Sequence, residues 1–168
     1  KQKTAYEIGV RLVGSEMCIR DRSMSPPVQI VASDLDTNCL SEARAAVYPM
    51  ERAERIEAAR LSKFFLKGTG KQTGMVRVRP DLTRLVEFMR INLLEPNWPL
   101  QGPFDAIFCR NVMIYFDKPT QYKVLARFKP LLRPDGLMFA GHSESFTHAT
   151  DQFRSLGRTV YERADAAR

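Results

Sequence analysis

The sequence predicts an α/β protein with an open sheet, and three observations support this class. Apolar runs at residues 28–33, 106–109 and 137–140 each stop abruptly at polar residues, as buried strands of such a sheet do at their carboxyl ends. Stretches with helical periodicity follow the first two runs. Proline- and glycine-rich turn signals separate the elements.

Length and composition limit the number of domains and the kinds of partner. With 168 residues, 44% of them hydrophobic, the chain suits one domain with a core. Its net charge of +7 favours an acidic partner, such as nucleic acid, anionic lipid or an acidic protein surface. Cys18, Cys39 and Cys109 form an odd set without metal-ligand spacing, so we expect no metal site and a cytoplasmic location. No apolar run approaches the roughly 18 residues that span a bilayer, and we expect no membrane insertion.

Residues 1–23 are expected to be a non-native leader. They mix charged and apolar side chains without a sustained period and lack the apolar core of a signal peptide. They resemble translated adaptor sequence. A native strand is the alternative, because residues 7–13 partly alternate. The domain itself is expected over residues 24–168.

The first strand, residues 28–33, ends in two acids, Asp34 and Asp36. A helix should follow, capped by Thr37 or Asn38. A carboxylate at such a strand end can accept hydrogen bonds from both hydroxyls of a ribose. The alternative is that either acid only caps the helix.

Residues 48–89 predict helices followed by a small antiparallel flap. Short helices are expected over 48–65, and the glycine-rich residues 68–74 form a turn, because they lack the spacing of a phosphate-binding P-loop. Residues 75–79 alternate apolar and basic side chains, as a half-exposed strand does. Residues 82–89 are expected to return as the second strand, giving the flap an arginine-bearing face.

Polar residues also follow the later strands. Asn92 can read an adenine edge, since an amide both donates and accepts, or it can be an ordinary turn residue. Arg110 and Asn111 either meet a ligand or begin a plain strand-to-helix loop. A helix from Lys118, a turn at 133–136, a strand at 137–140 and a hairpin at 153–163 complete the chain.

Five segments in order closely resemble the chemotaxis receptor methyltransferases, the CheR family, from Val28 to about Glu162. They are ASDLDTN, RINLL, FDAIFCRNVMIYFD, LLRPDGLMFAGHSES and GRTVY. The resemblance implies a Rossmann-like sheet of S-adenosylmethionine-dependent methyltransferases, with a small β subdomain inserted at about 68–88. It also implies that a monomer transfers the methyl group of S-adenosyl-L-methionine to glutamates of a methyl-accepting chemoreceptor.

The resemblance assigns cofactor contacts position by position. Asp34 would hold the ribose hydroxyls, and Asn92 and Leu93 would flank the adenine. Cys109 and Arg110, with Asn111 beside them, would line the cofactor pocket.

The resemblance places Tyr115 near the methyl group and the incoming carboxylate. Arg110 or Tyr115 would orient either the acceptor carboxylate or the methionine part of the cofactor. Methyl transfer to an ionised glutamate requires alignment and desolvation more than a strong base. His142 is therefore a weaker catalytic candidate, with ordinary loop hydrogen bonding as the alternative.

In some members the β subdomain binds the receptor's C-terminal peptide as an added strand. The turn containing Gly68 and Gly70 resembles the turn of these peptide-binding members. A strand edge beside Arg77 and Arg79 is expected to take the peptide backbone and its acidic groups.

Complete family members also have an N-terminal helical domain, a first strand and a glycine loop, which are not recognisable here. We therefore expect an N-terminally truncated chain that binds the cofactor poorly. The alternatives are a receptor-docking module without catalysis and a methyltransferase acting on another acceptor such as RNA. Nucleic acid is not the expected partner, because the arginines cluster in one flap and helix.

Overall fold

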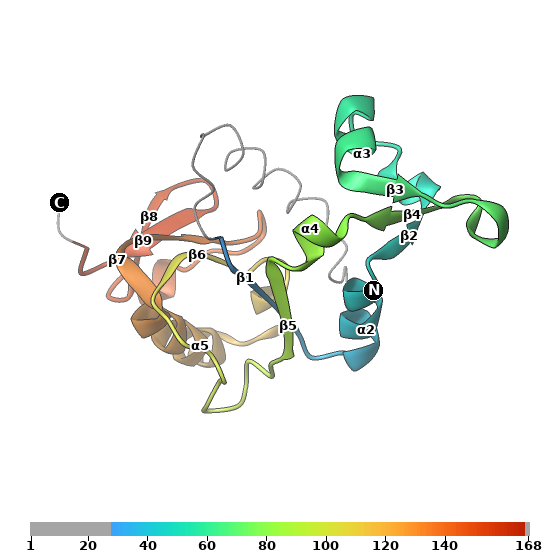
Figure 1. Cartoon of the computed structure of the whole chain (residues 1–168). Coiled ribbons are helices and arrows are strands. Elements are labelled where there is room, and N and C mark those ends of the chain that lie inside the picture. Colours follow the sequence, from blue (N-terminus) through green and yellow to red (C-terminus); the bar gives the residue numbers. More distant parts are fainter. Residues whose placement is uncertain (1–27, 167–168) are drawn as a thin grey trace. The chain divides into compact units, whose positions relative to one another are not determined.

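The structure is a computed structural model that describes residues 28–166. The predicted leader, residues 1–23, lies outside the described residues. The chain divides into two compact units, Lys1–Asn92 and Leu93–Arg168, and each is described by itself (Figure 1). Among the described residues, no helix is both long and apolar enough to cross a bilayer.

The first unit contains a parallel strand pair and a small antiparallel sheet. Its elements are β1 (Ile30–Asp34), α2 (Thr37–Ala45), β2 (Val47–Pro49), η1 (Met50–Ala53), α3 (Ala58–Phe64), β3 (Phe65–Lys67), η2 (Gly70–Gln72), β4 (Met75–Val78), α4 (Pro80–Thr83) and β5 (Val86–Arg90).

Strands β1 and β5 run parallel, with Ile30 opposite Val86 and Asp34 opposite Arg90. Both strands therefore end at the same edge (Figure 1). This pairing shows that the predicted returning strand at 82–89 is wrong. Helix α4 follows β4, and β5 then pairs with β1, because both sides of β4 are already occupied in the order β2-β4-β3.

The antiparallel sheet has its own apolar core. Strand β4 lies between β2 and β3, with Val76 opposite Tyr48 on one side and Lys67 on the other. The cluster beneath it consists of Ala53, Phe64, Phe65, Val76 and Leu82. Sequence periodicity missed β2, because a three-residue strand is too short to show a period.

The second unit is a mixed sheet in the order β6-β7-β9-β8. Its elements are β6 (Phe104–Phe108), η3 (Met113–Tyr115), α5 (Lys118–Leu131), β7 (Leu132–Phe139), η4 (Thr147–Ala149), β8 (Phe153–Gly157) and β9 (Val160–Arg163). Strands β6 and β7 are parallel, whereas β7, β9 and β8 pair antiparallel. The predicted terminal hairpin at 153–163 is confirmed.

The predicted turn at residues 133–136 is instead a bulge within β7. Phe104 lies opposite Leu132 and Ala106 opposite Leu137, so the intervening residues of β7 have no counterpart on β6. Arg133 there pairs with Asp105 and Asp135 at 3.3 and 3.0 Å. Turn-forming residues thus bulge out of the strand without reversing the chain.

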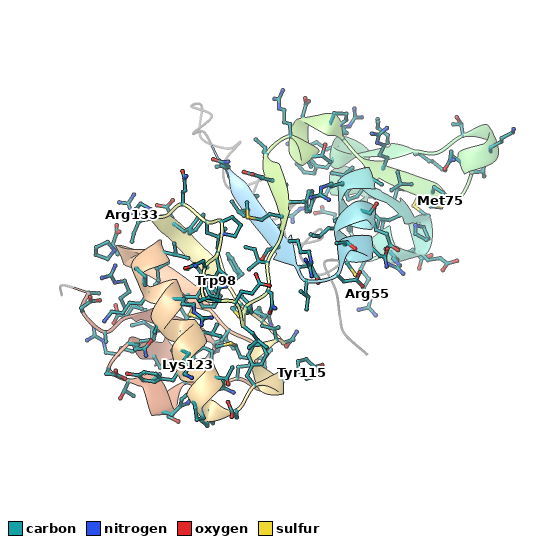
Figure 2. The ribbon with its side chains drawn as sticks, turned by 90° about the horizontal axis from the view of Figure 1, so that it is seen from below. Arg55, Met75, Trp98, Tyr115, Lys123 and Arg133 are labelled. Atoms are coloured by element: carbon teal, nitrogen blue, oxygen red, sulfur yellow. The ribbon has the colours of Figure 1, made fainter. Side chains whose placement is uncertain are left out.

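Helix α5 covers one face of this sheet with its apolar side. Val124, Leu125 and Phe128 are buried in a cluster that includes Met138 of β7. The ring of Trp98, which is labelled in Figure 2, has its centroid 5.0 Å from that of Phe128. These contacts hold the carboxyl ends of β6 and β7 on a packed core.

Strand β6 was expected to be buried, and this is only half correct. Ile107 packs against the α5 cluster, but Phe108 is 61% exposed and stacks on Phe139 with ring centroids 4.5 Å apart. Successive side chains of a strand point to opposite faces, and α5 covers one of them.

Candidate functional site

The end of β1 separates the roles of two acids that the sequence left open. Asp36 caps α2, because its Oδ1 accepts a hydrogen bond from the Asn38 amide at 2.8 Å. The predicted cap at Thr37 or Asn38 is therefore wrong. Asp34 Oδ1 accepts from the Asp36 amide at 2.9 Å, which closes a short Asx turn. Asp34 is thus a strand-end carboxylate and not the helix cap.

Asn92 follows β5 at the same edge as Asp34. The Ile91 amide donates to the Asp34 carbonyl at 3.2 Å, and Arg90 Nε donates to the Leu35 carbonyl at 3.3 Å. Two predicted site residues of the first unit are therefore brought to the ends of adjacent strands. Leu93 belongs to the second unit, where it packs against the α5 cluster.

In the second unit, the segment from Cys109 to Tyr115 leaves the end of β6 and is tied to the end of β7. The Cys109 amide donates to the Phe139 carbonyl at 2.9 Å, and Arg110 Nε donates to the Ala140 carbonyl at 3.2 Å. Asn111 has φ of 61°, a left-handed conformation that asparagine tolerates better than most residues.

A buried carboxylate, Glu144, holds the middle of this segment. Its side chain accepts hydrogen bonds from the amides of Val112 at 3.0 Å, Met113 at 2.8 Å and Gly141. Sequence reasoning gave Glu144 no role, although it lies four positions after a predicted buried strand.

A side chain at Gly141 would displace two neighbouring side chains. A Cβ there would lie 2.7 Å from both Asn111 Oδ1 and Glu144 Oε2, which is closer than real Cβ contacts allow. The absence of a side chain lets the loops after β6 and β7 pack directly on each other.

Tyr115 lies at the end of η3 and is 63% exposed (Figure 2). Gln121 of α5 also binds this turn, because its Nε2 donates to the carbonyls of Met113 at 2.9 Å and Phe116 at 3.0 Å. The structure thus brings together Cys109, Arg110, Asn111 and Tyr115 in one short segment.

The Cys109 side chain is part of the core and not of an open surface. It is 5% exposed, and burial, followed by the charge of Glu144, raises the pKa of its thiol. The thiol is neutral, so Cys109 is no nucleophile. His142, the weaker catalytic candidate, is exposed in the loop after β7.

The predicted peptide-binding residues lie on and beside β4. Arg77 is exposed on β4, between Val47 of β2 and Leu66 of β3. Arg77 thus lies on the central strand, and within the described residues the edges beside it are β2 and β3. Gly68 and Gly70 lie in the loop from β3 to β4, where Gly70 has φ of 57°.

Across residues 28–166, no group of three or more His, Cys, Asp or Glu side chains could hold a metal ion. In each unit, the candidate residues follow the carboxyl ends of parallel strands, which is where open α/β sheets bind ligands.

The chain belongs to the CheR methyltransferases. Residues 15–162 match the family described as "CheR methyltransferase, SAM binding domain", where SAM is S-adenosylmethionine. The matched range includes residues 15–23, which belong to the segment expected to be a non-native leader. It confirms the Rossmann-like methyltransferase fold and the cofactor implied by the resemblance.

The names of similar proteins agree with this family. The chain is 58% identical over 142 residues to chemotaxis protein methyltransferase 2 of Pseudomonas aeruginosa, covering 84% of this chain and 51% of the relative. It is 51% identical to the chemotaxis protein methyltransferase of Salmonella typhimurium and 50% identical to that of Escherichia coli, covering 79% of this chain and 46% of each relative. The chain thus spans about half the length of these relatives.

Proposed function

We propose that the chain acts in a cytoplasmic, S-adenosylmethionine-dependent methyltransferase that forms methyl esters on glutamate side chains of a chemoreceptor. The observation that carries this proposal is the segment from Cys109 to Tyr115. It has an arginine and an exposed tyrosine just beyond a parallel strand, in a chain 58% identical to a chemotaxis protein methyltransferase.

The cofactor would be held by residues at the strand ends. Asp34 has one carboxylate oxygen in the Asx turn, and its second oxygen suits a ribose hydroxyl. Asn92 and Leu93 would flank the adenine. The Cys109 carbonyl would line the pocket, because its side chain lies in the core. Asn111, which lies beside Gly141, is a further proposed cofactor contact of the second unit.

Arg110 and Tyr115 are proposed to align the reacting groups. When bound, S-adenosylmethionine supplies a methyl group on a positively charged sulfur. Arg110 Nε donates a hydrogen bond to the Ala140 carbonyl. The two terminal nitrogens of its guanidinium suit a carboxylate, either of the acceptor glutamate or of the cofactor. The Tyr115 hydroxyl would orient the acceptor oxygen that forms the new bond to carbon. No strong base is needed, since the acceptor is already ionised.

Transfer of labelled methyl groups to receptor glutamates tests this proposal. The chain should be compared with a version extended at its N-terminus by the preceding region of the Pseudomonas aeruginosa relative. We expect base-labile label on receptor glutamates and at least a roughly tenfold loss with Arg110→Ala or Tyr115→Phe. Ser143→Ala, an exposed change in the loop after β7, is the control.

The alternatives predict other results. If the label appeared in RNA and not in the receptor, the acceptor would be RNA and the proposed glutamate acceptor would be wrong. Receptor binding without any label, in both the chain and its extended version, would leave only a docking module. Isothermal titration with S-adenosylhomocysteine measures separately how well the chain itself binds the cofactor, which we expect to be weak. Sizing chromatography tests the expected monomer.

We further propose that the antiparallel sheet binds the receptor's C-terminal peptide as an added strand. Leu66 of β3 is 40% exposed on an edge strand, and Arg77 on the neighbouring β4 can attract acidic groups. Replacing Arg77 and Arg79 by Ala should weaken peptide binding by roughly three- to tenfold. The matched control is Arg84→Ala, since Arg84 is an exposed arginine that pairs with Asp81. Equal affinity of the double variant and the wild type would contradict the role of these arginines.

A further inference from the structure

Three polar side chains are buried in the part of the chain that the structure describes: Gln121, Glu144 and Gln152, with 8%, 7% and 5% exposure. Two of them bind the same short turn, η3. Burying a polar side chain is costly unless it is hydrogen-bonded. The placement of Glu144 and Gln121 around one turn therefore calls for an explanation beyond packing.

Glu144 binds the start of this turn. Its Oε1 accepts from the amides of Val112 and Met113, and its Oε2 accepts from the amide of Gly141. Amides at the start of a helix have no partner within the helix. The carboxylate satisfies two of them and links them to the loop that follows β7.

Gln121 binds the end of the turn. Its amide nitrogen donates to the carbonyls of Met113 and Phe116. The Met113 carbonyl also accepts from the Phe116 amide at 3.1 Å, so Gln121 binds where the turn closes. Gln121 lies on α5, one turn before Val124 and Leu125, which are both fully buried. The turn is thus attached to a helix that is fixed in the core.

A three-residue helix cannot maintain its own shape, since its few hydrogen bonds do not offset the entropy of forming it. The conformation of η3 therefore depends on its surroundings, which are the core around the fully buried Met113 and the two polar side chains that bind the turn. Arg110 precedes the turn and Tyr115 ends it, so the same contacts set where both side chains project.

We propose that Glu144 and Gln121 are positioning residues, which hold η3 from both ends and so orient Arg110 and Tyr115 for methyl transfer. The effect on transfer rests on the function proposed above, whereas the effect on the turn does not. Neither residue touches the reacting groups in this proposal.

The test uses Glu144→Ala, Glu144→Gln and Gln121→Ala, with Gln152→Ala as the matched control. Gln152 is equally buried, but it donates to the Tyr122 carbonyl at 3.3 Å and does not contact η3. Melting temperatures of all variants are measured first, so that loss of stability can be compared directly.

Amide hydrogen exchange by NMR is the first readout, and it requires no activity. Glu144→Ala should speed exchange at Val112 and Met113 at least roughly tenfold, and Gln121→Ala should do so at Phe116. Glu144→Gln keeps one acceptor oxygen and should lie between wild type and Glu144→Ala. Wild-type exchange at these amides, or the same increase in Gln152→Ala, would overturn the proposal whatever the function is.

Methyl transfer in the N-terminally extended chain is the second readout. We expect kcat to fall at least roughly tenfold in Glu144→Ala and Gln121→Ala, with a smaller change in KM for the receptor, and Glu144→Gln should restore part of the rate. Gln152→Ala should keep kcat at a similar melting temperature. Faster exchange with an unchanged kcat would overturn the positioning role and leave the proposed methyltransferase function intact.

Discussion

Cys109 and Cys39 are both thiols, but their surroundings give them different reactivity. Cys109 is 5% exposed, and burial raises its pKa. Cys39 is half-buried on α2, with Sγ 3.4 Å from Asp36 Oδ2. Since the thiolate is the reactive form, iodoacetamide at about pH 8 should modify Cys39 well before Cys109. Peptide mass spectrometry over time measures the two rates.

The control for this prediction is the same reaction in denaturant, where the two thiols should react at similar rates. Modification of Cys109 in the folded chain as fast as that of Cys39 would contradict its place in the core.

At the scale of elements, the start of α5 depends on Asp117, which accepts from the Thr120 amide at 2.9 Å. Hydrogen bonds from Thr120 lower the pKa of Asp117 below its ordinary value of 3.8. A carboxyl with a lowered pKa in the folded state stabilises the fold above its unfolded pKa, and this stabilisation disappears as the pH falls through the folded pKa. The melting temperature should therefore decrease below about pH 4.

Asp117→Asn tests this assignment, because asparagine can still cap a helix but does not titrate. Its melting temperature, followed by circular dichroism, should fall less steeply with acid than that of the wild type. Part of the slope should remain, since the pKa values of Asp36, Asp135 and Asp165 are also lowered. An identical slope in Asp117→Asn would show that Asp117 does not contribute.

At the scale of the whole molecule, the net charge of +7 favours encounter with an acidic protein surface. Raising the salt concentration from about 0.05 to 0.5 M shortens the Debye length, so association with the receptor should slow several-fold. Stopped-flow measurements give the rate. Lys71→Glu with Lys123→Glu lowers the net charge at two exposed positions outside the proposed methyl-transfer site and should flatten the salt dependence. Equal salt slopes would contradict charge-driven encounter.

The sequence alone predicted the class of fold, strands over residues 28–33 and 106–109, which the structure places at 30–34 and 104–108, and the hairpin at 153–163. These features are local. Periodicity, turn residues and a polar residue directly after an apolar run all lie within a few positions of one another. Asp34, Asn92, Arg110 and Asn111 were recognisable because they directly follow strands.

Tertiary packing sets which strands pair and which side chains hold the segment from Cys109 to Tyr115. It pairs β5 with β1 and not with β4, turns the Cys109 side chain into the core, and brings Glu144 and Gln121 to the two ends of η3. Most of these contacts join residues far apart in the chain, whereas those of Gln121 with Met113 and Phe116 span only eight and five positions. Such contacts depend on the packing of whole elements, so no local pattern in the sequence encodes them.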